Sequence, residues 1–310
     1  MFRTILLLAC MMGLQIQGWT QTYEIPADAQ RILFLGNSIT YQGTYIEFID
    51  AYLTLKYPNR TFELINAGLP SETVSGLSER GHANGQFRRP DLHDRLARVL
   101  EMTQPDLVIS NYGMNDGIYK PFNGRRFRKY RAGIEWLDAQ VKAAGARIIH
   151  VTPPMFDARK DPKYAEVIAR YAEWLLNKQE TDDWKVMDIH GPMMEELAAE
   201  RQDDPEFAFA KDGIHPNRAG HFVMAKALIA QLGEQAFADM AEFEAFIASN
   251  PQGGEVFEWV KKRQRMMKDA WLSAIGHAHP RMKQGLPLEE AQAKWVEIGA
   301  QIEALLQVVE

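Results

Sequence analysis

Apolar positions along the 310-residue chain follow two alternating patterns. Five short runs are rich in Ile, Leu, Val and Phe and are bounded by turn-forming residues, which is typical of strands buried on both faces of a sheet. Between them, apolar residues recur at spacings of three and four, as amphipathic helices require. The predicted strands cover residues 31–36, 62–66, 106–111, 147–152 and 185–189.

The predicted helices lie between these strands. Pro90 and Pro162 stand at the start of two of them, where a missing N–H costs little. The alternation predicts an α/β protein with a parallel sheet covered on both faces. Because ligands bind at the carboxyl ends of strands in such sheets, chemistry is expected in the loops that follow strands. The helical stretches cover residues 45–57, 91–103, 127–144 and 163–178.

The pattern changes after about residue 235, and only helical periodicity continues from there. We predict a main domain over residues 28–235 and a helical C-terminal extension over residues 236–310. Three roles remain open for the extension: packing on the main domain, contact with a second copy in a homo-oligomer, or cover for the functional site.

The first 21 residues have the layout of a signal peptide, with Arg3 at the charged start and an apolar stretch at 4–14 that is too short to span a bilayer. We therefore expect a secreted or periplasmic protein, with a buried N-terminal helix as the alternative. Cys10 comes too early for a convincing lipoprotein anchor. It is the only cysteine, so its removal with the signal peptide would exclude disulfides, a cysteine nucleophile and thiolate metal sites.

Charge and hydropathy narrow the class of protein further. The formal net charge is -6, which gives no basic footprint for nucleic acid. No later stretch is long and apolar enough for a membrane span. The histidines and carboxylates form no convincing metal cluster, so we expect neither a metal nor a cofactor.

Four short polar motifs follow the predicted elements. Each alone has an ordinary explanation, because Ser suits a helix N-cap, Gly suits a positive φ, and Asn-Asp-Gly and Asp-Gly are turn sequences. Together they converge on one edge of the predicted sheet. The motifs are Gly36-Asn37-Ser38, Asn66-Ala67-Gly68, Gly113-Met114-Asn115-Asp116 and Asp212-Gly213-Ile214-His215.

These motifs supply the parts that acyl transfer needs. A serine hydroxyl requires a base within hydrogen-bond reach, and Ser38 and His215 are the candidates. Asp212 would orient the imidazole and stabilise its charged form. The tetrahedral intermediate needs preorganised donors, for which the N–H groups of Ser38 and Gly68 and the amide of Asn115 are candidates.

On these four blocks, over about residues 31–232, the chain resembles the SGNH (GDSL-like) hydrolase family. The resemblance implies a flavodoxin-like three-layer sandwich and ester hydrolysis through an acyl-serine, without a metal or cofactor. Two positions depart from the family pattern. Asn37 replaces the usual aspartate before the serine, and Ser71 occupies the place of a second glycine in the glycine block, which puts the role of Gly68 in doubt.

Other histidines of the chain are rival candidates for the base. His190, with Asp188 nearby, is the main competitor of His215 as the base, whereas His150 fits a satisfied core residue and His221 fits packing in the following helix. The other four histidines lack a suitably paired acid, and most of them are expected at the surface; they are His82, His93, His277 and His279. A nucleotide-binding loop would need more glycines after the first strand.

The sequence thus predicts a secreted serine esterase that acts on a small-molecule or polysaccharide ester. Aromatic residues lie near the motif loops. Packing in the core is their default role, and stacking on a sugar ring is the second. Because of this second role, deacetylation of a carbohydrate is the leading hypothesis. A lipase, lysophospholipase or thioesterase is the alternative enzyme, and a non-catalytic binding protein on the same fold is the other. These aromatic residues are Tyr41, Tyr45, Tyr112, Tyr119 and Phe122.

Overall fold

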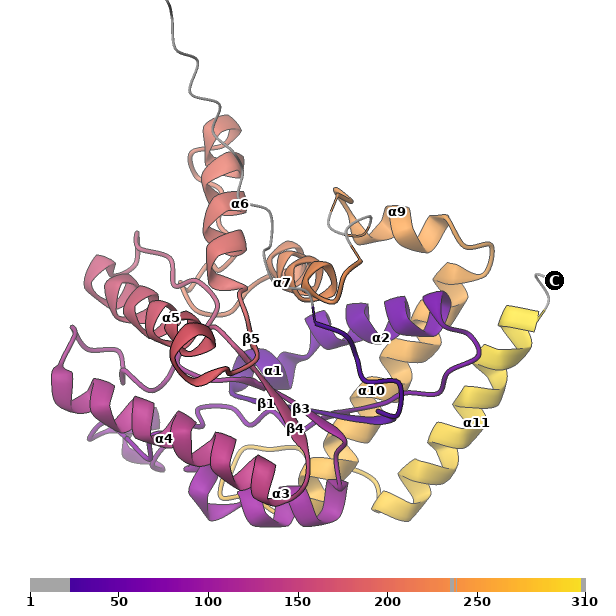
Figure 1. The fold of residues 1–310 in the computed structure, drawn as a ribbon, viewed down its shortest axis with the longest axis horizontal. Helices are drawn as coiled ribbons and strands as arrows, with labels where there is room; N and C mark the ends of the chain where they lie inside the picture. Colours follow the sequence, from indigo (N-terminus) through magenta and orange to yellow (C-terminus); the bar gives the residue numbers. More distant parts are fainter. Residues whose placement is uncertain (1–22, 235–236, 238, 308–310) are drawn as a thin grey trace, which may run out of the picture.

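The structure is a computed structural model and describes residues 23–234, 237 and 239–307 (Figure 1). The predicted signal peptide, Cys10 included, lies outside these residues. Within the described ranges, no helix combines the length and apolar character needed to cross a bilayer.

One sheet of five strands forms the centre of the molecule, in the order β2-β1-β3-β4-β5 with every neighbouring pair parallel. In β1, Leu33 lies opposite Ile65 of β2 and Val108 of β3. This sheet confirms the predicted α/β fold class. The strands are β1 (Arg31–Gly36), β2 (Glu63–Asn66), β3 (Leu107–Asn111), β4 (Arg147–Val151) and β5 (Val186–Met187).

Helices cover both faces of the sheet, and the apolar side chains between the layers form the core (Figure 1). Asp161 caps α5 by accepting hydrogen bonds from the N–H groups of Lys163 and Tyr164, and Pro162 stands in the first turn, as expected. The helices of the main domain are α1 (Ser38–Gln42), α2 (Thr44–Lys56), α3 (Leu96–Thr103), α4 (Gly124–Ala143), α5 (Pro162–Asp182), α6 (His190–Asp203) and α7 (Arg218–Gln231).

The prediction of a continuous helix over 91–103 was wrong at its start. Asp91 forms a parallel bridge with Thr73, and the Pro90 carbonyl accepts a hydrogen bond from the Thr73 N–H at 3.1 Å. A single turn of 3-10 helix, η2 (Leu92–Asp94), follows before α3 begins at Leu96. The loop after β2 thus competes for the backbone groups that a longer helix would have used.

The C-terminal part includes α9 (Phe243–Ala248), α10 (Gly253–Ile275) and α11 (Leu288–Gln307), and it packs on the main domain through α9 and α10. Helix α10 contacts α2 and the edge strand β2, while α11 contacts α10 on its outer side (Figure 1). Arg263 donates to Asp50 Oδ1 at 2.7 Å, and Gln264 donates to Asp50 Oδ2 at 2.7 Å and to the Leu64 carbonyl. These buried contacts shield the side of β2 that has no partner strand.

Candidate active site

The nucleophile candidate lies in the sharp turn where β1 becomes α1. A side chain at Gly36 would overlap Thr40 and the carbonyl of Asn111, so glycine permits this close approach. Asn37 caps α1 by accepting a hydrogen bond from the Ile39 N–H at 3.1 Å. The amide oxygen performs this capping without a negative charge, so the replacement of aspartate preserves the local turn. Ser38, the first residue of α1, is thereby held at the carboxyl edge of the sheet.

Three side chains from distant parts of the chain meet at this edge. Ser38 Oγ lies 2.8 Å from His215 Nε2, and His215 Nδ1 lies 2.6 Å from Asp212 Oδ2. The other oxygen of Asp212 accepts backbone hydrogen bonds from Ile214 at 2.9 Å and His215 at 2.8 Å. Partial burial raises the pKa of Asp212, but the hydrogen bonds from His215 and Ile214 outweigh burial and hold the pKa below its usual value.

The site is open to solvent. The side chains of His215 and Asp212 are 43% and 52% exposed, and Ser38 is half-buried. Four cavities of about 380 to 540 Å³ open elsewhere on the surface, and none of these four is lined by Ser38, Asp212 or His215. The triad thus lies outside these four cavities, and an ester carried on a large molecule can approach the serine from solvent.

Asn115 is buried in the loop after β3, with 3% of its surface exposed. Its Nδ2 donates to the Glu72 carbonyl at 3.0 Å, and its Oδ1 accepts from the Tyr119 hydroxyl at 2.9 Å. Because an amide NH₂ carries two donors, one N–H remains for another acceptor. Asn115 is thus connected to the loop after β2 as well as to its own loop.

Asp116 stabilises the same loop through hydrogen bonds to the backbone. Its two carboxylate oxygens accept backbone hydrogen bonds from Ser75 at 2.9 Å and from Gly113 at 3.0 Å. Complete burial raises the pKa of Asp116 to about 6, even though these hydrogen bonds oppose the change. Asp116 therefore holds the loop that carries Asn115 against the loop after β2.

The N–H of Gly68, expected to face the oxyanion, is bonded to the end of β2. Its N–H donates to Asn66 Oδ1 at 2.9 Å, and a side chain here would overlap the backbone of Thr40 and Tyr41. Glycine at this position lets the loop after β2 lie against α1. Three residues on, Ser71 has a φ of 64°, and its N–H has no hydrogen-bond partner within the described part of the chain.

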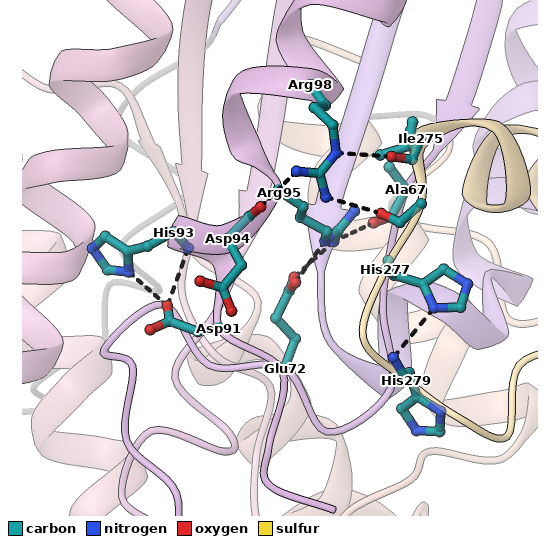
Figure 2. A network of polar contacts seen from close by, with 12 residues as sticks. Ala67, Glu72, Asp91, His93, Asp94, Arg95, Arg98, Ile275, His277 and His279 are labelled. Carbon is teal, nitrogen blue, oxygen red and sulfur yellow. Dashed lines mark hydrogen bonds and ion pairs between the residues drawn. The ribbon is translucent and has the colours of Figure 1, made fainter.

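A buried ion pair anchors the loop after β2, and the sequence pattern did not reveal it. Arg95 contacts both carboxylate oxygens of Glu72 at 2.6 and 2.7 Å and also donates to the Ala67 carbonyl at 2.8 Å (Figure 2). The Tyr112 hydroxyl donates to Glu72 Oε2 at 2.7 Å. The side chains of Arg95 and Glu72 are 2% and 0% exposed, so the pair is screened from water. It joins the start of α3 to the first residues of this loop.

Among the described residues, neither His190 nor His150 is hydrogen-bonded to Ser38, whose hydroxyl meets His215. The carboxylate of Asp188 accepts hydrogen bonds from the backbone of His190 and Gly191 and from the Thr152 hydroxyl, rather than from the His190 ring. His150 is a satisfied core residue, with its ring nitrogens 2.9 Å from Ser110 Oγ and 3.3 Å from Asp138 Oδ1.

Two histidines assigned to the surface without an acidic partner do have one. His93 Nδ1 lies 2.6 Å from Asp91 Oδ1, and its ring stacks on Trp136. His82 Nδ1 lies 3.1 Å from Glu79 Oε1. Neither ring contacts a serine hydroxyl, so neither forms a second Ser-His-Asp arrangement. Among the described residues, no group of three or more His, Cys, Asp or Glu side chains is arranged to hold a metal ion.

A parallel α/β sandwich with a serine, a histidine and an aspartate joined at the carboxyl edge of its sheet defines the class of serine hydrolases. The model of the GDSL-like lipase/acylhydrolase family matches residues 34–222 of the chain. The chain belongs to this family and is an ester hydrolase, as the four sequence blocks implied.

Individual relatives agree with this assignment. An acetylxylan esterase from Geobacillus stearothermophilus is 23% identical over 226 residues, which cover 66% of this chain and 94% of that protein. The crystal structure of a catalytic mutant of an acetylxylan esterase from the same organism has a TM-score of 0.54 at 21% identity, covering 68% of this chain and 97% of that one, and shows the shared fold.

A gut microbial diltiazem-metabolizing enzyme has a TM-score of 0.56 at 25% identity. The match covers 69% of this chain but only 49% of that enzyme, so the chain spans about half of its length.

Proposed function

We propose that Ser38 is the nucleophile, His215 the general base and Asp212 the residue that orients the imidazole. The observation that carries the proposal is the continuous hydrogen-bonded path from Ser38 Oγ through the His215 ring to Asp212, with distances of 2.8 and 2.6 Å. Both distances suit proton transfer to a base whose other ring nitrogen donates to a carboxylate.

The reaction proceeds in two halves. The Ser38 proton passes to His215 Nε2 as Oγ attacks the carbonyl carbon of the ester. The tetrahedral intermediate collapses, the C–O bond to the alcohol breaks, and the leaving oxygen takes the proton from His215. Water then loses a proton to His215 and attacks the carbonyl carbon of the acyl-serine. The bond from that carbon to Oγ breaks, His215 returns the proton to Oγ, and the carboxylic acid leaves.

The oxyanion of the intermediate needs donors within hydrogen-bond reach. We assign the Ser38 N–H and the second N–H of Asn115 Nδ2 to this role. The N–H of Ser71 replaces that of Gly68 as the third donor, because the Gly68 N–H is bonded to Asn66 while the Ser71 N–H has no hydrogen-bond partner among the described residues.

For the substrate, we propose a short acyl group, with acetyl as the best candidate, carried on a carbohydrate outside the cell. The exposed triad supports an ester on a bulky molecule, and the similarity to an acetylxylan esterase supports the sugar. The predicted signal peptide supports secretion. Tyr45 and Tyr112 are buried and so pack in the core, but Phe122 remains exposed as a candidate surface for a sugar ring.

The test compares Ser38→Ala with Ser249→Ala, which changes an exposed serine at the end of α9. We expect Ser38→Ala to lose nearly all turnover of an acetyl ester and all labelling by a fluorophosphonate, with an unchanged circular dichroism spectrum. The control should behave like the wild-type chain. Labelling that persists in Ser38→Ala would reject the assignment, and an unreactive wild-type chain would favour a binding protein.

Chain length separates the two enzyme hypotheses. A series of aryl esters from acetyl to dodecanoyl, together with acetylated xylooligosaccharides, measures the preference directly. We expect kcat/KM to fall as the acyl chain lengthens. A preference for long chains would reject the sugar-ester proposal in favour of a lipase or thioesterase, while leaving the triad assignment intact.

A further inference from the structure

The loop after β3 stores backbone strain next to Asn115. Ile118 and Tyr119 both have left-handed backbones, with φ of 47° and 51°. A left-handed conformation costs roughly 1–3 kcal/mol for a non-glycine residue, and a β-branched residue such as Ile118 adopts it rarely. Two such residues in succession persist only where surrounding contacts hold them.

The side chain of Tyr119 makes those contacts. Its hydroxyl donates to Asn115 Oδ1 at 2.9 Å, and its ring packs against the ring of Tyr164 with centroids 4.8 Å apart. On the ring of Tyr119, the guanidinium of Arg89 lies 5.2 Å from the centroid. Glu79 holds Arg89 through two hydrogen bonds of 2.6 and 2.7 Å.

These contacts determine which way the amide of Asn115 faces. The Glu72 carbonyl can only accept, so Nδ2 must face it, and Oδ1 must then face Tyr119. Burial raises the pKa of Tyr119 well above its usual value, so the phenol stays protonated at neutral pH and can donate. With both ends engaged, the direction of the remaining N–H of Nδ2 is fixed.

We propose that Tyr119 is a positioning residue for ester hydrolysis, holding the Asn115 amide so that its unused N–H meets the oxyanion. The inference rests on the proposed roles of Ser38 and Asn115. A hydrogen bond accepted at Oδ1 also polarises the amide and strengthens its N–H donors. The strained turn at Ile118 and Tyr119 is the means by which the phenol reaches Oδ1, since it turns the chain back toward Asn115.

The test variant is Tyr119→Phe, which removes one oxygen and keeps the ring that contacts Arg89 and Tyr164. Tyr57→Phe is the matched control, because it removes a bonded phenol oxygen outside this loop, one that donates to Glu234 Oε1 at 2.6 Å. We expect Tyr119→Phe to lower kcat about tenfold on an acetyl ester with KM changed less than twofold. Tyr57→Phe should leave kcat within twofold of wild type.

A double-mutant cycle distinguishes positioning from general support of the loop. In an Asn115→Ala background, Tyr119→Phe should cause no further loss of kcat, because the group that it positions is gone. Binding of an aryl boronic acid, which forms a tetrahedral adduct with an activated serine, should weaken about tenfold in Tyr119→Phe alone.

The outcomes separate the two hypotheses. An active wild-type chain with a kcat for Tyr119→Phe within twofold of wild type would overturn the positioning role and leave the triad standing. The same would follow if Tyr119→Phe lost an equal factor in the Asn115→Ala background. A wild-type chain without Ser38-dependent turnover would overturn both proposals together.

Discussion

His221 is predicted to make the folded chain sensitive to acid. It lies in α7, fully buried, with its ring stacked on Tyr45 at a centroid distance of 5.9 Å and an interplanar angle of 5°. Neither ring nitrogen has a hydrogen-bond partner among residues 23–234, 237 and 239–307. Burial, together with the nearby His215, lowers the pKa of His221 from its ordinary 6.5 to about 3.

The sign of the effect follows from proton binding. Between about pH 3 and pH 6.5 the unfolded chain binds a proton at His221 that the folded chain excludes. The free energy of unfolding therefore falls as the pH drops below 6.5, by about 1.4 kcal/mol for each pH unit. From pH 6.5 to pH 5 this amounts to about 2 kcal/mol from one side chain.

Phenylalanine at this position would keep the stacked ring and remove the titration. We expect His221→Phe to be more stable than wild type by about 1–3 kcal/mol at pH 7.5, since a buried unpaired N–H is removed. At pH 5 the advantage should grow by about 2 kcal/mol. Urea unfolding followed by tryptophan fluorescence at pH 5, 6 and 7.5 measures both quantities, and other titrating groups cancel in the difference between variants.

His150→Phe provides the contrast, because the ring of His150 is bonded to Ser110 and Asp138. This variant should be less stable than wild type at pH 7.5, by about 1–3 kcal/mol, because two buried polar groups lose their partner. Equal pH slopes for wild type and His221→Phe would refute the reasoning about His221, whatever the stability at pH 7.5.

Two further predictions concern the site and the loop that supports it. Asp212→Asn should lower kcat by roughly 10³–10⁴-fold with little change in KM, because an amide no longer stabilises the charged imidazole. Steady-state kinetics on an acetyl ester measure this, and a loss below tenfold would contradict the role of Asp212. Arg95→Met should lower the free energy of unfolding by about 3–5 kcal/mol, measured by urea unfolding, because the Glu72 carboxylate is left buried without its cation. Adding Glu72→Gln should recover part of this loss. A further, additive loss in the double variant would contradict the pairing.

Local patterns in the sequence were sufficient for the architecture. Runs of apolar residues between breakers located all five strands, because a strand buried on both faces admits few polar side chains. The ends of strands were less certain, and β5 has two residues where five were expected. The four polar motifs likewise led to Ser38, Asp212 and His215, whose side chains are joined by hydrogen bonds in the structure, because the carboxyl ends of parallel strands share one edge.

Only the tertiary structure decided the contacts between residues far apart in the chain. The Gly68 N–H faces Asn66 rather than the expected oxyanion, Arg95 pairs with Glu72, and Tyr119 reaches Asn115 through a strained turn. No period or motif marks such pairs, since they depend on how loops from different strands pack together. Periodicity reflects which side of an element is buried, whereas the partner of a buried polar group depends on the packing of the whole chain.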